Sequence, residues 1–183
     1  IDDLAAWCQH GLVVSAAVNI SAKLVYSTEF IDKAKRILAE TGIPRNRLIF
    51  EVTESATIDD PSAAVAALQH FRDLGIAISM DDYGTGQSTL TYIKQLPLSE
   101  LKIDRSFVQH AHEDANDALL VQSTIDLAHR LGLRVVAEGV EDRRCLTFLR
   151  EAGCDLAQGY FIGRPTSPEE MREMLTSHTS LAA

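Results

Sequence analysis

The sequence predicts an α/β domain in which helices alternate with the strands of a mainly parallel sheet. An amphipathic segment that ends in glycine is followed by a short apolar segment, and this pattern repeats at intervals of roughly 20 to 35 residues. The connections are short, which favours parallel strands joined by right-handed crossovers. No linker or low-complexity stretch interrupts the chain, so we expect residues 1–183 to form a single domain with a short C-terminal tail.

Six apolar segments are the predicted strands. In chain order they are Val13–Ile20, Arg47–Thr53, Ile76–Asp82, Glu100–Asp104, Arg134–Glu138 and Leu156–Phe161. Glycine just past a helix is a common C-cap, and four of these segments follow a pair that ends in glycine: Thr41-Gly42, Leu74-Gly75, Leu131-Gly132 and Ala152-Gly153.

The helix starts also carry clear signals. Asp60-Pro61 places an N-cap before a proline at the first helical position, and three apolar residues then share one face, namely Ala64, Leu68 and Phe71. Ser167-Pro168 repeats this opening for the last helix. Asp3–His10 is expected to be the end of a helix, and Thr89–Gln95 an additional helical turn that stops before Pro97.

Composition narrows the functional class. The 183 residues are 46% hydrophobic and 23% charged, which is typical of a globular protein. A formal charge of -9 argues against a nucleic acid polymer as partner. No segment approaches the roughly 20 apolar residues of a membrane span, so we expect a cytoplasmic domain that meets a membrane only through other domains. Cys8, Cys145 and Cys154 are expected to be buried, reduced thiols, and His110 and His112 to be solvated.

Polar residues lie in or near the C-terminal half of every predicted strand, where parallel sheets and barrels carry their active sites. They are Asn19, Glu51, Glu54, Asp81, Asp82, Lys102, Glu138 and Gln158. Individually, each has a structural explanation: a cap for Asn19, solvent exposure for Glu51, an ion pair between Lys102 and Asp104, or backbone hydrogen bonds for Glu138 and Gln158. One shared, oxygen-lined site explains all six strand ends together.

The most distinctive stretch runs from Ser79 to Gly86, where an apolar strand closes on Asp81-Asp82 and is followed by Gly84 and Gly86. A regular strand would direct these two carboxylates to opposite faces. Adjacent carboxylates near a sheet end favour a divalent cation, although Asp-Asp before glycine is also typical of a turn. Oxygen ligands without His or Cys suit Mg²⁺ or Mn²⁺, and two such ions would suit phosphoryl transfer.

These residues resemble the EAL-domain family of bacterial cyclic di-GMP phosphodiesterases. The matching stretches are Val18-Asn19-Ile20-Ser21, Glu51-Val52-Thr53-Glu54-Ser55, Asp81-Asp82-Tyr83-Gly84-Thr85-Gly86, Leu101-Lys102-Ile103-Asp104-Arg105-Ser106-Phe107, Ala137-Glu138-Gly139-Val140-Glu141 and Ala157-Gln158-Gly159-Tyr160. The resemblance implies a TIM-barrel-like fold and metal-dependent hydrolysis of cyclic di-GMP to linear pGpG.

The resemblance also implies a role for each matched residue. Asn19, Glu51 and Asp81 would bind one Mg²⁺ or Mn²⁺, and Asp81, Asp82 and Glu138 a second, with Asp81 bridging. Lys102 would lie beside the attacking water, and Gln158 would be a polar support of the catalytic site.

A loop is implied as well. Glu54 would anchor the Asp82–Ser88 loop, which the family associates with homodimerisation and control of activity. Its matched residues are Gly84, Thr85, Gly86 and Ser88.

One departure from the family pattern is important, because the Glu-Ala-Leu signature itself is absent. In the family it lies on a strand upstream of Asn19 and supplies a metal ligand. We therefore expect an incomplete TIM-barrel-like fold, with about six strands of eight, that alone is unstable and hydrolyses little cyclic di-GMP. Two other hypotheses remain: a receptor that binds cyclic di-GMP without cutting it, and an unrelated barrel enzyme with Lys102 as Schiff base or general base.

Overall fold

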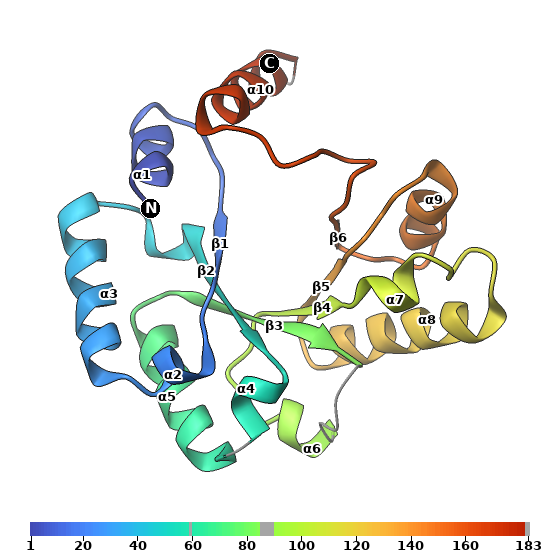
Figure 1. The fold of residues 1–183 in the computed structure, drawn as a ribbon, viewed down its shortest axis with the longest axis horizontal. Coiled ribbons are helices and arrows are strands. Elements are labelled where there is room, and N and C mark those ends of the chain that lie inside the picture. The colour runs from blue at the N-terminus through green and yellow to red at the C-terminus, as the bar shows by residue number, and fades with distance from the viewer. Residues whose placement is uncertain (59, 85–89, 182–183) are drawn as a thin grey trace.

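A computed structural model describes residues 1–58, 60–84 and 90–181 of the chain. The described residues form one sheet of six strands, which follow one another in chain order (Figure 1). All five neighbouring pairs are parallel. The strands are β1 (Ala16–Asn19), β2 (Leu48–Thr53), β3 (Ala77–Tyr83), β4 (Glu100–Ile103), β5 (Arg134–Ala137) and β6 (Leu156–Ala157).

Most helices lie outside the curled sheet, which has the shape of a half-barrel, while the last helix lies near the first, away from the strands (Figure 1). The helices are α1 (Asp2–Gln9), α2 (Ala22–Val25), α3 (Thr28–Thr41), α4 (Ser55–Ile58), α5 (Pro61–Asp73), α6 (Leu90–Ile93), α7 (Arg105–Val108), α8 (Ala115–Arg130), α9 (Arg143–Glu151) and α10 (Pro168–Leu181), with a 3₁₀ turn at Arg45–Arg47. Helix α5 packs on β3, and α8 packs on β4 and β5. The predicted α/β class, with six parallel strands, is thereby confirmed.

The main core lies between the strands and these helices. Phe30 of α3, Phe50 of β2 and Phe71 of α5 meet there, with ring centroids 5.1 Å apart for Phe50 and Phe71. The predicted inner face of α5 is buried, since Ala64, Leu68 and Phe71 are almost inaccessible to solvent. This packing holds the N-terminal half of the sheet against its outer layer.

The predicted helix ends are confirmed. The Asp60 side chain accepts a hydrogen bond from the Ala63 amide at 3.0 Å, and α5 begins with a proline. Ser167 and Glu170 cap each other's amides at the start of α10. The four glycines expected to follow helices, Gly42, Gly75, Gly132 and Gly153, all have positive φ.

The two edge strands are shorter than predicted. β1 begins at Ala16, and Val13 is exposed. β6 ends at Ala157 because the next residues pair with the loop after β5 instead of continuing a ladder: the Val140 amide donates to the Gln158 carbonyl and the Phe161 amide to the Val140 carbonyl. Tyr160 and Phe161 are consequently exposed. In the described part of the chain, β1 and β6 are the open edges of the sheet.

Some smaller expectations are corrected. The helical turn near residue 90 spans Leu90–Ile93, while Thr89 lies outside the described residues. Cys145 is buried, but Cys8 and Cys154 are only partly so; all three are free thiols. His112 is not solvated, because its side chain packs beside Asp142. No helix among the described residues is long and apolar enough to cross a membrane.

Candidate metal centre

The predicted site residues lie along the edge of the sheet that the carboxyl ends of the strands form. Asn19 ends β1, and β2 pairs it in register with Glu51. Asp81 and Asp82 lie near the end of β3, and Lys102 lies in β4. Glu138 directly follows β5, and Gln158 directly follows β6. Parallel pairing in chain order therefore brings residues far apart in sequence to a common edge.

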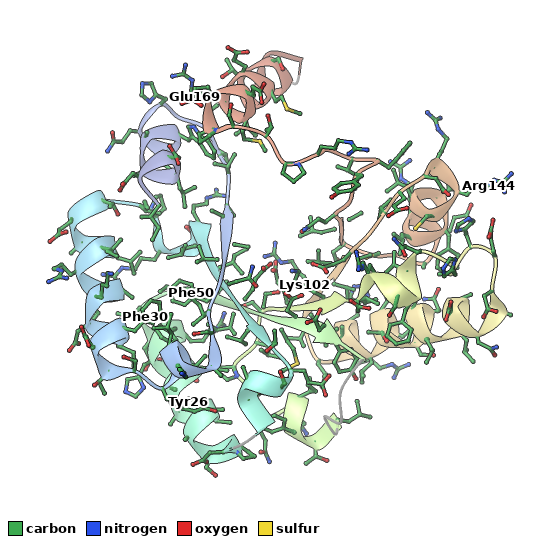
Figure 2. All side chains as sticks on the ribbon, in the orientation of Figure 1. Tyr26, Phe30, Phe50, Lys102, Arg144 and Glu169 are labelled. Carbon is green, nitrogen blue, oxygen red and sulfur yellow. The ribbon has the colours of Figure 1, made fainter. Side chains whose placement is uncertain are left out.

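Lys102 is the centre of this edge. Its side chain is only 4% exposed, and its Nζ lies 2.9 Å from Glu51 Oε1, 3.1 Å from Asp81 Oδ1 and 2.5 Å from Glu138 Oε1. Figure 2 shows Lys102 within the space that the strands enclose. The alternative of an ion pair with Asp104 is wrong, because Asp104 instead accepts the Ser106 amide at 2.9 Å and caps α7.

The Asp81-Asp82 pair departs from regular strand geometry. The pairing of β3 with β4 shifts register between Met80 and Tyr83, and Asp82 has a left-handed φ of 57°. Its amide donates to Asp81 Oδ1 at 3.1 Å. The expectation that the two carboxylates point to opposite faces is wrong, since the bulge brings both to one place. Aspartate is among the few residues that adopt this conformation at moderate cost.

Three carboxylates lie close enough together to share a metal ion. Ligand oxygens of Asp81, Asp82 and Glu138 are all within 4.8 Å of one another. Such hard, oxygen-only donors fit Mg²⁺ or Mn²⁺, so this part of the predicted ligand set suits the expected cofactor. Glu51 joins the same cluster through Lys102. Asn19 is exposed beside Glu51 at the strand edge.

The electrostatics reflect an excess of negative charge. Burial alone would lower the pKa of Lys102, but its hydrogen bonds to Glu138 and Glu51 raise that pKa well above the ordinary value, so the amine stays charged. Burial raises the pKa of Glu138 against the opposing effect of Lys102. Burial and the neighbouring Asp81 raise the pKa of Asp82. Four carboxylates around one ammonium leave charge that a divalent cation would neutralise.

Gln158 and Glu54 lie at the margins of the cluster. The Gln158 side chain is exposed and makes no hydrogen bond to the Lys102 cluster in the described part of the chain. The backbone amide of Gln158 donates to the Ala137 carbonyl at 2.8 Å. Glu54 is buried, and its amide donates to the Asp81 carbonyl at 3.2 Å, which ties the end of β2 to β3.

Of the predicted loop, only its first residues are described. Gly84 has a φ of 100°, and a Cβ there would lie 3.1 Å from the Phe107 ring, so glycine suits this position. Thr85, Gly86 and Ser88 lie outside the described residues.

The structure adds supporting residues that sequence reasoning missed. Tyr26, directly after α2, and Tyr92 of α6 donate hydrogen bonds to the carbonyls of Ala56 and Thr57, and thereby hold α4 in place after β2. Nothing in the sequence pattern indicates these contacts. Gly139 has a φ of 72° and packs against Arg105. Its position directly after Glu138 in the sequence could have indicated this role.

Comparison with known proteins agrees with this arrangement. A family model described as the EAL domain matches residues 1–165. The chain is 40% identical over 155 residues to the bifunctional diguanylate cyclase/cyclic di-GMP phosphodiesterase MucR of Pseudomonas aeruginosa, covering 85% of this chain and 23% of MucR. It is 38% identical over 167 residues to the cyclic di-GMP phosphodiesterase NbdA of the same species, covering 91% of this chain and 21% of NbdA. The chain thus spans less than a quarter of the length of these relatives.

Solved structures give the same result. A PaMucR phosphodiesterase in complex with c-di-GMP superposes with a TM-score of 0.88 at 37% identity, covering 93% of this chain and 69% of that one. The EAL domain of Mycobacterium smegmatis DcpA superposes with a TM-score of 0.91 at 33% identity, covering 96% of this chain and 80% of that one. The half-barrel therefore matches TIM-barrel structures of this family, and the chain belongs to the EAL domain family.

Proposed function

We propose that this chain is the metal-binding part of a cyclic di-GMP phosphodiesterase, which hydrolyses cyclic di-GMP to linear pGpG in cytoplasmic signalling. The observation that carries the proposal is the convergence of Glu51, Asp81 and Glu138 on Lys102, with Asp82 beside them. A purely structural core does not need four carboxylates at one sheet edge, since each buried charge costs free energy. The similarity to MucR and NbdA supports the same substrate.

The residues divide the chemistry between them. Asn19, Glu51 and Asp81 would hold one Mg²⁺ or Mn²⁺, and Asp81, Asp82 and Glu138 a second; bound ions would supply charge stabilisation and an activated water. Lys102 orients the carboxylates that it contacts, and its positive charge stabilises negative charge that develops on the phosphodiester. Gln158 would contribute polar support when substrate fills the exposed edge beside it.

The Schiff-base hypothesis for Lys102 fits poorly. That chemistry requires a neutral amine, which enzymes obtain by lowering the lysine pKa. Here the hydrogen bonds to Glu138 and Glu51 outweigh burial and raise the pKa of Lys102. The same ammonium suits electrostatic stabilisation of a phosphoryl group.

The test compares binding and hydrolysis of cyclic di-GMP by wild type, Asp81→Asn and Asp73→Asn, with Mn²⁺ and with chelator. Both the 183-residue chain and any longer protein that contains it should be assayed, because the open edges at β1 and β6 lead us to expect little turnover from the chain alone. Asp81→Asn should reduce Mn²⁺-dependent turnover by ~100-fold or more, given that loss of an outer-shell partner alone costs about 10–100-fold.

Asp73→Asn is the matched control, since Asp73 is an exposed carboxylate of α5 that accepts a hydrogen bond from Gln69 of the same helix. It should leave turnover unchanged. Full activity of Asp81→Asn would refute the proposal, whereas binding of cyclic di-GMP without product in every preparation would identify a receptor. Homodimerisation through the Asp82–Ser88 loop remains a prediction, which sedimentation with and without cyclic di-GMP would test.

A further inference from the structure

We infer that Lys102 is a built-in cation of the metal centre: its ammonium holds the ligand carboxylates together without metal, and a divalent ion competes with it for the same oxygens. This inference rests on the proposed function and adds to it a control on metal binding. It concerns the free energy of the metal-free site, not a step of the reaction.

The first argument is the number of hydrogen bonds that Lys102 can make. An ammonium group has three N–H donors. In the structure three different carboxylates, from Glu51, Asp81 and Glu138, lie within 3.1 Å of Nζ, so all three donors are engaged. The ammonium is saturated by the proposed ligands and has no donor left for a water molecule or a phosphate. Lys102 can act on either only after at least one carboxylate has exchanged it for another cation.

The second argument is charge. Glu51, Asp81 and Glu138 have side chains only 11%, 15% and 19% exposed, and Asp82 adds a fourth carboxylate to their cluster. Removing the one ammonium would leave these charges uncompensated in a poorly solvated place. A divalent ion carries twice the charge and accepts the same oxygens, so it can replace Lys102 as the counter-ion. Binding of the divalent ion and the ion pairs of Lys102 therefore each weaken the other.

A second ion pair, between the exposed Arg134 and the buried Glu100, provides a control at the opposite end of the same strands. At the starts of β4 and β5, Arg134 Nη2 lies 2.6 Å from Glu100 Oε2, and the Glu100 side chain is 4% exposed. One guanidinium meets one carboxylate there. Losing Arg134 should also destabilise the fold, because the buried Glu100 carboxylate loses its partner, but this loss has no link to the metal.

The experiment measures thermal unfolding of wild type, Lys102→Met and Arg134→Met in EDTA and in saturating Mn²⁺. In EDTA, Lys102→Met should lower the melting temperature by ~10 °C, the effect expected for an orphaned buried charge. The rise caused by Mn²⁺ should be larger in Lys102→Met than in wild type by ~5 °C or more. In Arg134→Met this rise should equal that of wild type. Titration followed by the EPR signal of free Mn²⁺ should show ~10-fold tighter binding by Lys102→Met.

Each outcome decides the question. Equal Mn²⁺-induced rises in wild type and Lys102→Met would overturn this inference and leave the proposed function intact, because metal would still bind. No rise in wild type or in either variant would overturn both. If Lys102→Met fails to fold in EDTA, Lys102→Gln, which keeps two N–H donors without the charge, takes its place. Failure of both variants to fold in saturating Mn²⁺ would overturn the inference, since the ion would then be unable to replace the ammonium.

Discussion

Replacing Gly139 by alanine tests whether the backbone after β5 positions Glu138. Gly139 has a φ of 72°, and a Cβ there would lie 2.4 Å from Arg105 Cβ and 3.2 Å from Arg105 Cα. The residues on either side are held by backbone hydrogen bonds, from the Glu138 amide to Ile103 and from the Val140 amide to Gln158. The chain cannot move away from α7 without shifting Glu138.

Gly132→Ala separates the two contributions to the loss of stability, namely the left-handed backbone and the contact with Arg105. Gly132 lies just before β5, has a φ of 74°, and a Cβ there would meet nothing within 4 Å. Either alanine variant should lose ~1–2 kcal/mol from the left-handed backbone. Only Gly139→Ala should lose a further ~1–3 kcal/mol from the clash with Arg105. At about 2–4 °C per kcal/mol for a chain of this size, the melting temperature should fall by ~2–8 °C for Gly132→Ala and ~4–20 °C for Gly139→Ala.

The assay is thermal unfolding of both variants together with Mn²⁺ titration at a temperature where both are folded. Gly139→Ala should bind Mn²⁺ more weakly, because Glu138 moves, while Gly132→Ala should bind as wild type does. If the two variants lose equal stability, the contact with Arg105 has no energetic effect. If Gly139→Ala binds Mn²⁺ normally, the left-handed turn does not position the ligand.

Two predictions concern parts of the fold away from the metal centre. Burial would raise the pKa of Asp155, but hydrogen bonds from His129 and the Val135 amide lower it, so Asp155 stabilises the fold above its unfolded-state pKa and this contribution is lost as pH falls below about 4. Asp155→Asn should therefore flatten the acid side of a plot of melting temperature against pH; an unchanged slope would contradict the assignment. Leu68→Ala removes a fully buried side chain of α5 and should cost ~2–5 kcal/mol by urea unfolding, with Mn²⁺ affinity unchanged. A loss below ~1 kcal/mol would mean that the core relaxes around the site.

Most of the fold could be predicted because its signals are local. The N-cap at Asp60, the apolar face of α5 and the glycines that end helices each act within a few residues, and each has the predicted geometry. The order of a parallel sheet follows from short crossovers, which leave few topologies. The two edge strands were less predictable, since a strand at an edge is shortened by tertiary contacts such as that of Gly159 with the Val140 backbone.

The geometry of the site could be predicted only in part. Sequence position alone indicated that Glu51, Asp81 and Glu138 would lie at one sheet edge, because each lies in or near the C-terminal half of a parallel strand. It did not indicate that Lys102 would contact all three, since no pattern in the sequence reports which side chains meet across strands. It was wrong for Asp82, because the rule of alternating faces assumes a regular ladder, and the bulge between Met80 and Tyr83 breaks it.

The departures from regular backbone lie on both sides of Lys102. β4, which carries the lysine, pairs with β3 on one side and β5 on the other. β3 deviates at Asp82, with a φ of 57°, and the chain after β5 deviates at Gly139, with a φ of 72°. Each deviation falls at or directly beside a carboxylate of the cluster, and a regular ladder would have directed Asp82 elsewhere. Left-handed backbone at Asp82 costs about 1–2 kcal/mol and persists only where other contacts require it. The cluster therefore needs a cation to hold it, and in the metal-free protein the cation at its centre is Lys102.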